Sequence, residues 1–188
     1  MENPYEEILL EAEDRMEKGV AVLEGDLRGI RTGRASPALV EGIRVEYYGT
    51  PTPLQQLASI SVPEARLLVV RPFDPTALKE IERALQKSDL GVSPSNDGKV
   101  IRLALPPLSE EQRKKLAARV KDVAEQTRVA LRNIRRDVLK QVDASEEKSA
   151  LTEDDARKLR DDVQETIKRF EGKVTEILDR KTKEILEG

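Results

Sequence analysis

Three long segments of the chain carry apolar residues spaced three and four positions apart, the pattern of a helix that packs on one face. They run from Leu9 to Ile30, from Leu116 to Val138, and from Leu159 to Ile177. Residue pairs suited to N-capping precede them, namely Asn3 with Glu6, Ser109 with Gln112, and Thr152 with Asp155. Because one such helix cannot bury its apolar stripe alone, the pattern predicts a bundle of three long helices.

Residues 31 to 105 follow a different pattern, in which short alternating runs replace the helical spacing. Apolar and polar residues alternate from Ile43 to Tyr48, as in a strand, and the glycine and prolines of Gly49 to Pro53 then break the chain. Three more strands and a helix opened by Asp74-Pro75 are predicted at Ala58–Val62, Leu67–Arg71, Val100–Leu103 and Asp74–Leu85. This segment is therefore expected to form a small α/β domain rich in strands.

The order of these segments predicts an α+β fold with an inserted domain. Residues 1–30 and 106–188 form a long antiparallel three-helix bundle, and residues 31–105 form the small α/β domain between its first two helices. Residues 143–155, which are charged and small, form the turn between the second and third helices.

The chain crosses between the two predicted domains twice, near residues 31–34 and 105–108. A glycine at the first crossing and two prolines at the second are typical of a two-stranded hinge. The candidate hinge residues are Arg31, Thr32, Gly33, Arg34, Pro106 and Pro107. An ordinary alternative stays open, in which Gly33 ends a helix and Pro106-Pro107 only precede the Ser109 cap.

Composition excludes several classes of protein. The 188 residues contain no His and no Cys, which removes the commonest general base, the commonest metal ligand and every thiolate nucleophile. Charged residues make up 37% and aromatic residues 3%, as expected for long solvated helices with aliphatic seams. The N-terminus is acidic and no apolar run approaches the length of a membrane helix, so we expect a soluble cytoplasmic protein.

Charge is concentrated on the second long helix, although the whole chain has a net charge of −3. Residues 106–142 hold ten bases and five acids, whereas residues 1–30 hold three bases and nine acids. At roughly 100° per residue, seven of these bases fall within a sector of about 140°. They are Arg113, Lys114, Lys121, Arg128, Arg132, Arg135 and Arg136, and Glu125 is the only acid in that sector between Arg113 and Arg136.

A basic stripe of this length favours a polyanion as its partner, because about 30 helical residues span about 45 Å. Arginine outnumbers lysine, which suits bidentate contact with phosphate, and no aromatic residue is interleaved to stack single-stranded bases. Folded or duplex RNA is therefore the predicted partner. The alternative is a solvated face whose bases pair with the acidic first and third helices.

Enzymatic chemistry has little support in the sequence. No Gly-x-x-x-x-Gly-Lys-Ser/Thr or Gly-x-Gly-x-x-Gly loop is present. The acids Glu153, Asp154, Asp155, Asp161 and Asp162 offer oxygen ligands for Mg²⁺, but a helix start and a solvated face explain them as well. We expect no catalytic residue, no metal site, no cofactor and no small-molecule substrate.

Five short motifs, in order along nearly the whole chain, resemble the bacterial ribosome recycling factor family. They are Arg-Thr-Gly-Arg-Ala-Ser-Pro (31–37), Val-Glu-Tyr-Tyr-Gly-Thr-Pro-Thr-Pro-Leu (45–54), Ser-Asp-Leu-Gly (88–91), Leu-Pro-Pro-Leu (105–108) and Arg-Asn-Ile-Arg-Arg (132–136). The resemblance implies a monomeric, L-shaped molecule of two domains with a tRNA-like outline and a flexible hinge.

The same resemblance implies a function after translation termination. Members of the family act with the GTPase elongation factor G to split the ribosome into subunits and release it from mRNA. It implies contact with large-subunit rRNA through the basic helix, and the matching positions are Arg113, Arg132, Arg135 and Arg136. Gln112 departs from the basic residue commoner in the motif. Lys121 and Arg128 join the predicted RNA-binding set because they share the basic sector.

Two other functions compete with an RNA-binding translation factor. One is a coiled-coil adaptor whose α/β domain binds protein and whose basic face is incidental. The other is a hydrolase that uses carboxylate-bound metal. Salt-dependent binding to ribosomes would favour the RNA-binding translation factor over the adaptor. Magnesium-dependent turnover of a nucleotide or phosphoester by the purified protein would favour the hydrolase.

Overall fold

The structure, a computed structural model, describes residues 4–187, and contacts divide the chain into two compact units. Unit 1 runs to Leu27 and from Ala118 to Thr182, and unit 2 holds Arg28 to Ala117 and the chain from Lys183 onward. These dividing points fall inside helices, whereas the predicted domain boundaries at 30/31 and 105/106 follow the change from helical to strand patterning. The predicted boundaries therefore stay a prediction.

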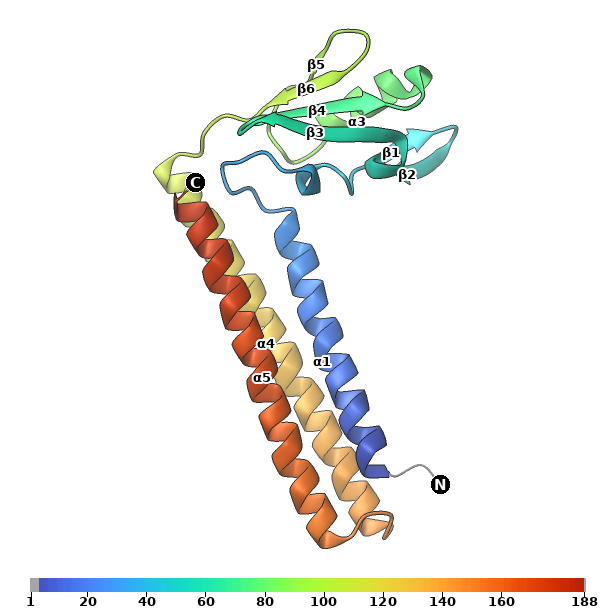
Figure 1. The fold of residues 1–188 in the computed structure, drawn as a ribbon, viewed down its shortest axis with the longest axis vertical. Coiled ribbons are helices and arrows are strands. Elements are labelled where there is room, and N and C mark those ends of the chain that lie inside the picture. Colours follow the sequence, from blue (N-terminus) through green and yellow to red (C-terminus); the bar gives the residue numbers. More distant parts are fainter. Residues whose placement is uncertain (1–3, 188) are drawn as a thin grey trace. The chain divides into compact units, whose positions relative to one another are not determined.

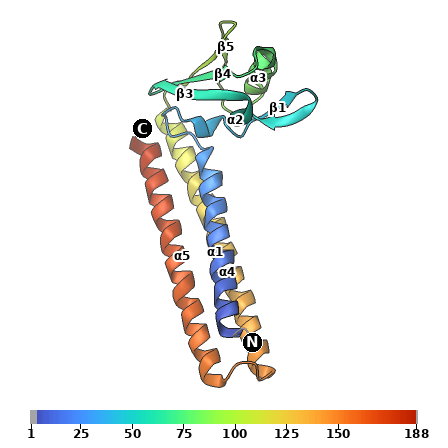
Figure 2. The ribbon, with the colours of Figure 1, turned by 45° about the vertical axis from the view of Figure 1, so that its right-hand side comes forward.

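Three long helices dominate the fold: α1 (Pro4–Arg28), α4 (Glu110–Glu147) and α5 (Glu153–Glu187). Figures 1 and 2 show them side by side, with α4 running opposite to α1 and α5. The antiparallel three-helix bundle predicted from the apolar spacing is confirmed.

The apolar stripes of these helices meet in the core of unit 1. Its completely buried side chains include Ala12, Met16 and Leu23 from α1, Leu131 and Val138 from α4, and Leu159, Val163 and Ile167 from α5. Burying an aliphatic side chain of this size contributes roughly 1.5–3 kcal/mol relative to leaving it in water. The core residues therefore fix which face of α4 turns outward.

The turn between α4 and α5 is shorter than the predicted segment 143–155. Helix α4 continues to Glu147, because Asp143 and Glu146 are held from the opposite helix by the guanidinium group of Arg160. The Arg160 Nη2 atom lies 2.8 Å from Asp143 Oδ1. The ion pairs raise the pKa of Arg160, chiefly through the hydrogen bond to Asp143. The tertiary contact with Arg160 thus explains why α4 extends beyond the end that the apolar pattern predicted.

Two of the three predicted N-caps are present, and the third, at Asn3, lies outside the described residues. Ser109 N donates to Gln112 Oε1 over 2.9 Å, and Gln112 N donates to Ser109 Oγ over 3.2 Å, forming a reciprocal capping box at the start of α4. At the start of α5, Asp155 N donates to Thr152 Oγ1 over 3.1 Å. The starts of both helices are therefore set by the residues that the sequence indicated.

Unit 2 contains an antiparallel sheet with the strand order β3-β4-β6-β5. Its strands are β3 (Ala58–Glu64), β4 (Leu67–Pro72), β5 (Ser95–Asn96) and β6 (Ile101–Ala104). The register places Leu68 opposite Leu103 and Val70 opposite Ile101, and all four side chains are buried in one core. Helix α3 (Leu78–Gln86) adds two buried side chains to that core, and it begins after the 3₁₀ turn η2 (Pro75–Ala77) that Asp74 caps.

A second, two-stranded sheet corrects the break predicted at Gly49–Pro53. Strand β1 (Arg44–Tyr47) pairs with β2 (Thr50–Pro53), and the register sets Pro51 and Pro53 opposite Glu46 and Arg44. Each strand of such a hairpin has one open edge, where a proline needs no backbone donor. Three short elements were also not predicted, namely the 3₁₀ turn η1 (Pro37–Leu39), helix α2 (Leu54–Leu57) and strand β5.

Candidate nucleic-acid interface

The six predicted RNA-binding residues all lie on α4, where they differ in exposure. Lys121 and Arg136 are exposed, and neither side chain forms an ion pair or hydrogen bond with another residue of the 4–187 range. The other four are half-buried: Arg113, Arg128, Arg132 and Arg135. We refer to the six together as the α4 stripe. It begins at the core boundary of the helix and extends around to its solvent-facing side.

Two arginines of the stripe lie along the boundary with α5 and hydrogen-bond to it. Arg128 Nη2 donates to Thr175 Oγ1 over 2.9 Å, and Arg135 Nη1 donates to Gln164 Oε1 over 3.2 Å. The later arginine of α4 bonds to the earlier acceptor of α5, as expected for two antiparallel helices. Because a hydroxyl and an amide carry no charge, these bonds position both guanidinium groups without neutralising them.

The first turn of α4 lies in unit 2 and carries Arg113 beside Gln112. Arg113 Nη1 donates to the main-chain oxygen of Leu186 over 3.2 Å, so this residue too is anchored to the last turn of α5. Gln112, which departs from the family motif, accepts the hydrogen bond from Ser109 N with its side-chain oxygen, as part of the capping box. Its role in the structure is therefore local, at the start of the helix.

Glu125 lies within the stripe and contacts two of its arginines. Its Oε1 atom accepts a hydrogen bond from Arg132 Nη2 over 2.9 Å, and its Oε2 atom lies 3.7 Å from Arg128 Nη1. The hydrogen bond from Arg132 is the main cause that lowers the pKa of this carboxyl. One carboxylate thus offsets part of the positive charge at the middle of the stripe.

Ion pairs between helices of unit 1 are made mainly by bases outside the stripe. Arg15 Nη2 on α1 lies 3.0 Å from Asp137 Oδ2 on α4. Arg169 Nη2 on α5 lies 2.8 Å from Glu13 Oε1 on α1. Within the stripe, Arg128 and Arg132 pair with Glu125 on the same helix. For Arg128 and Arg132, these ion pairs differ from the alternative in which the basic face pairs with the acidic first and third helices.

The residues of the first predicted crossing are held to those of the second within unit 2. Arg31 Nη2 donates to the Pro106 main-chain oxygen over 2.6 Å, and burial lowers the pKa of this arginine. Gly33 has φ of 87° and lies five residues beyond the end of α1 at Arg28, so it does not occupy the helix C-cap position. The ordinary explanation of Gly33 as a cap is therefore wrong. Thr32 is half-buried, while Arg34, Pro106 and Pro107 are exposed.

Three of the five carboxylates that the sequence offers for Mg²⁺ have other partners. Asp154 pairs with Arg157 over 3.4 Å, Asp155 accepts from Thr152, and Asp162 accepts from the Tyr5 hydroxyl. Within residues 4–187, no group of three acids is placed to hold a metal ion. Asp154 and Asp155 act at the start of α5, and Asp162 links α5 to α1.

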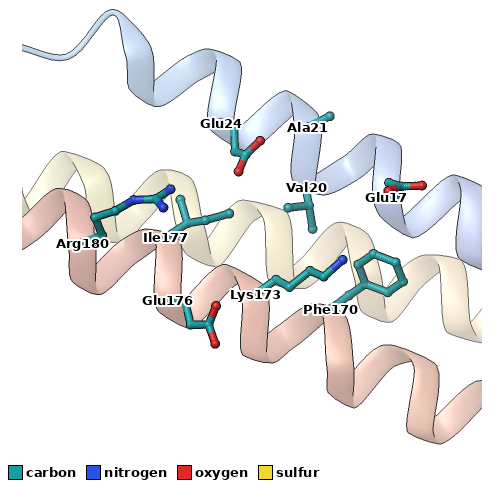
Figure 3. Close-up of a pocket in the computed structure, with 9 residues that line it drawn as sticks. All are labelled: Glu17, Val20, Ala21, Glu24, Phe170, Lys173, Glu176, Ile177 and Arg180. Atoms are coloured by element: carbon teal, nitrogen blue, oxygen red, sulfur yellow. The ribbon is translucent and has the colours of Figure 1, made fainter.

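A groove of about 350 Å³ lies between α1 and α5 in unit 1, and the sequence did not indicate it. Figure 3 shows Val20, Phe170 and Ile177 along its floor, with Glu17 and Glu24 on the α1 side. The charged residues of the α1 rim are acids alone, the α5 rim carries Lys173, Glu176 and Arg180, and the three apolar side chains of the floor are already at least nine-tenths buried. Sequence reasoning also missed Thr175 and Gln164, whose only signal is that both are neutral polar residues on α5.

The fold and the stripe define a helical-bundle protein with an inserted α+β unit and one long cationic helix face. Comparison with known proteins makes the assignment specific. The family model described as ribosome recycling factor matches residues 23–186, and the chain belongs to this family. None of the described helices is long and apolar enough to cross a membrane.

Relatives and solved structures agree with the family assignment. The chain is 50% identical over 180 residues to the ribosome-recycling factor of Brevibacillus brevis strain 47, covering 96% of this chain and 97% of the relative. It is 50% identical over 182 residues to that of Nitratidesulfovibrio vulgaris strain DP4, covering 97% and 98%. A solution structure of the ribosome recycling factor matches with a TM-score of 0.80 at 37% identity, over 100% of both chains.

A second solved structure places a relative in a larger assembly. It describes models for the ribosome recycling factor of T. thermophilus and the elongation factor G of E. coli, bound to the E. coli post-termination complex. The chain matches that recycling factor with a TM-score of 0.68 at 42% identity, over 97% of this chain and 98% of that one.

Proposed function

We propose that this protein binds the post-termination ribosome and, together with elongation factor G and GTP, separates it into subunits and frees it from mRNA. Membership of the ribosome recycling factor family supports this proposal, as does the match to a relative described on a post-termination complex with elongation factor G. The protein acts in the cytoplasm, as a monomer, with the ribosome and the GTPase as its partners.

The observation that carries the proposal is the α4 stripe. Arg128 and Arg135 are held by uncharged acceptors on α5, and Lys121 and Arg136 are exposed with no ion-pair partner among the described residues. A row of positioned guanidinium groups suits phosphates of folded RNA, because each group can offer two parallel donors. Contacts of this kind orient a protein on RNA without reading base sequence. Large-subunit rRNA is the RNA that we assign to the stripe.

The protein supplies no catalysis of its own in this proposal. Its sequence has no nucleotide-binding loop. It has 36 acidic residues but no His or Cys that could act beside them as a base, nucleophile or metal ligand. The free energy for splitting comes from GTP hydrolysis by the partner. The bundle stays docked through the stripe while the α/β domain, joined by crossings at 31–34 and 105–108, moves relative to it.

Binding to purified ribosomes at increasing salt tests the role of the stripe. Lys121→Ala with Arg136→Ala removes two exposed cations that have no described ion-pair partner, so the fold is expected to persist. If both contact phosphate, affinity falls and the slope of log affinity against log salt decreases by roughly 1.5 to 2. Charge reversal with Arg132→Glu and Arg135→Glu should weaken binding further.

A matched control comes from the same helix. Arg119→Ala with Lys140→Ala removes two exposed cations of α4 that lie outside the basic sector. This control should leave both the affinity and the salt slope close to those of the unaltered protein. Equal losses from the two double variants would show that only net charge matters, and no loss from the stripe variant would reject RNA binding by this face.

A further inference from the structure

Two of the five Phe and Tyr residues of this chain are strongly exposed, and both lie in unit 2. Tyr48 is 80% exposed at the tip of the β1–β2 hairpin, and Phe73 is 69% exposed just after β4. In a chain without Trp, exposed rings of this size are unusual surface, because an aromatic side chain is normally the first to be buried. Figure 1 shows the hairpin standing out beside α3.

The two rings belong to one corner of unit 2. The ring of Tyr48 meets the ring of Tyr47 edge-on, with 4.6 Å between centroids. The Tyr47 hydroxyl donates to Asp74 Oδ2 over 2.8 Å, and Asp74 directly follows Phe73. Phe73 N donates to the Leu57 main-chain oxygen over 2.9 Å, which fixes its backbone. Tyr47 therefore connects the exposed ring of Tyr48 to the carboxylate of the residue that follows Phe73.

Tyr48 also occupies a backbone position that does not favour it. Its φ is 48° and that of Gly49 is 76°, as in a two-residue hairpin turn whose central residues are both left-handed. Asn, Asp or Gly is preferred at the first of these positions, and a bulky residue there stores strain. The tyrosine ring therefore has neither burial nor turn geometry to explain it, which directs attention to contact with another molecule.

Two carboxylates, those of Asp74 and Glu46, lie beside the aromatic residues. Asp74 Oδ1 accepts from Thr76 N over 2.9 Å and from Thr76 Oγ1 over 2.8 Å, and these bonds together with that from Tyr47 lower the pKa of the carboxyl. Glu46, next to Tyr47 on β1, is exposed as well. A nucleic acid would bring its phosphates toward these carboxylates, whereas a cation gains both from the carboxylate and from the faces of the rings.

We propose that Tyr48, Phe73 and Asp74 form a docking corner for an arginine- or lysine-bearing loop of a protein partner. The cationic side chain lies against the exposed rings and toward the Asp74 carboxylate, and the aromatic residues supply most of the binding energy. This inference rests on the proposed function, because the partner is met on the post-termination ribosome. It concerns unit 2, whereas RNA contact concerns the α4 stripe.

The turn geometry allows a test that separates docking from folding. Tyr48→Asn removes the ring but suits the left-handed backbone, so the thermal midpoint should stay unchanged or rise. The rate of subunit splitting on purified ribosomes with elongation factor G and GTP should nevertheless fall about tenfold at limiting protein concentration. Tyr48→Phe keeps the ring and should split ribosomes at nearly the unaltered rate.

Photocrosslinking identifies the occupant of the corner. Benzoylphenylalanine replaces Tyr48 in the full chain, which is bound to purified post-termination ribosomes with elongation factor G and a non-hydrolysable GTP analogue. The expected crosslink joins position 48 to a protein segment that contains Arg or Lys. A crosslink to rRNA, a crosslink to a protein segment without a basic residue, or none above that from exposed Leu10 on α1 would overturn the proposal.

Failure of this inference is distinguishable from failure of the proposed function. If Tyr48→Asn splits ribosomes normally while the Lys121 and Arg136 variant loses ribosome binding, only the docking corner is wrong. If the stripe variant binds normally at every salt concentration, RNA binding by the stripe is wrong whatever the corner does.

Discussion

Glu125 Oε1 accepts a hydrogen bond from Arg132 Nη2 two helical turns further along α4, over 2.9 Å. The same carboxylate has its second oxygen 3.7 Å from Arg128, so two stripe arginines share one acid. Both side chains are about half exposed to solvent, and an ion pair so accessible to water adds little to stability. Its larger effect is on the surface, where the acid competes with any incoming phosphate for the same two guanidinium groups.

Removing this acid should strengthen binding to RNA. Glu125→Gln keeps the shape of the side chain but abolishes its charge, and we expect ribosome affinity at low salt to rise roughly two- to fivefold. The salt dependence should become steeper, because Arg128 and Arg132 are then available to phosphate. Filter binding or light scattering at several salt concentrations measures both quantities. Unchanged or weaker binding would mean that Glu125 orients the arginines for contact.

The capping box at the start of α4 should contribute measurably to stability. Ser109→Ala removes the acceptor for Gln112 N, and such a loss costs about 0.5–2 kcal/mol of unfolding free energy. Denaturant or thermal unfolding gives this value. Ser109→Asp restores an acceptor and should recover most of the loss, whereas Ser109→Ala with undiminished stability would show that water replaces the cap.

Gly33 provides a test of the predicted hinge. With φ of 87°, it occupies a backbone region closed to proline, whose φ is fixed near −65°. Gly33→Pro therefore redirects and stiffens one of the two crossings, and we expect ribosome binding within about twofold of normal but loss of most subunit splitting. Sedimentation of post-termination ribosomes with elongation factor G and GTP separates these two effects.

Two variants accompany the Gly33 experiment. Gly33→Ala places a Cβ on a left-handed residue and should destabilise the protein by about 1–2 kcal/mol without locking φ, so splitting should persist. Gly42 is also in unit 2, has no atom within 4 Å of an added Cβ and no left-handed φ, so Gly42→Ala should change neither property. If Gly33→Pro folds and splits ribosomes normally, the first crossing is not a hinge.

Alkaline unfolding should depend on Tyr5. Burial, and next the hydrogen bond to Asp162, raise the pKa of the Tyr5 hydroxyl from 10.0 to about 12. The folded state therefore holds this proton more tightly than the unfolded chain does. The contribution of the proton to stability is complete below pH 10 and is lost between about pH 10 and 12.

Tyr5→Phe isolates that contribution from the titration of lysines. The difference in thermal midpoint between the unaltered protein and Tyr5→Phe should be constant from pH 7 to about pH 9 and should shrink toward pH 12. Asp162→Asn is the companion variant, because it keeps a partner for the hydroxyl but removes the charge. A difference that stays constant through pH 12 would show that the ionisation of Tyr5 is not coupled to folding.

Much of the helical architecture was predictable because it depends on local periodicity. The three-four spacing around Met16 and Ile167 indicated the buried faces of α1 and α5 correctly, and Ser109 marked the start of α4 to the residue. On α4 the predicted stripe included Ala130, which is exposed, and missed Leu131, which is completely buried. Strand pairing depends on distant partners, so the prolines at 51 and 53 concealed β2 until its register with β1 was known. Similarly, the contact of Arg160 with Asp143 explains why α4 outlasts its apolar pattern.

The candidate interface was predictable in outline but not in detail. Helical angles placed Lys121 and Arg136 with the arginines on one sector, yet an angle does not say which neighbouring helix borders that sector. Only the packing of α5 reveals that Arg128 and Arg135 lie at the boundary and bond to Thr175 and Gln164. The exposed rings of Tyr48 and Phe73 were equally hidden, because sequence alone does not separate a buried aromatic residue from an exposed one.

The bonds from α4 to α5 have a consequence for the thermodynamics of recognition. A free arginine side chain loses up to about 2 kcal/mol of conformational entropy when it is fixed. Arg128 and Arg135 already lose part of this conformational entropy when the protein folds, because they hydrogen-bond to Thr175 and Gln164. Immobilising them against a phosphate therefore demands less than immobilising Lys121 or Arg136, so the helix arrives at its ligand partly preorganised.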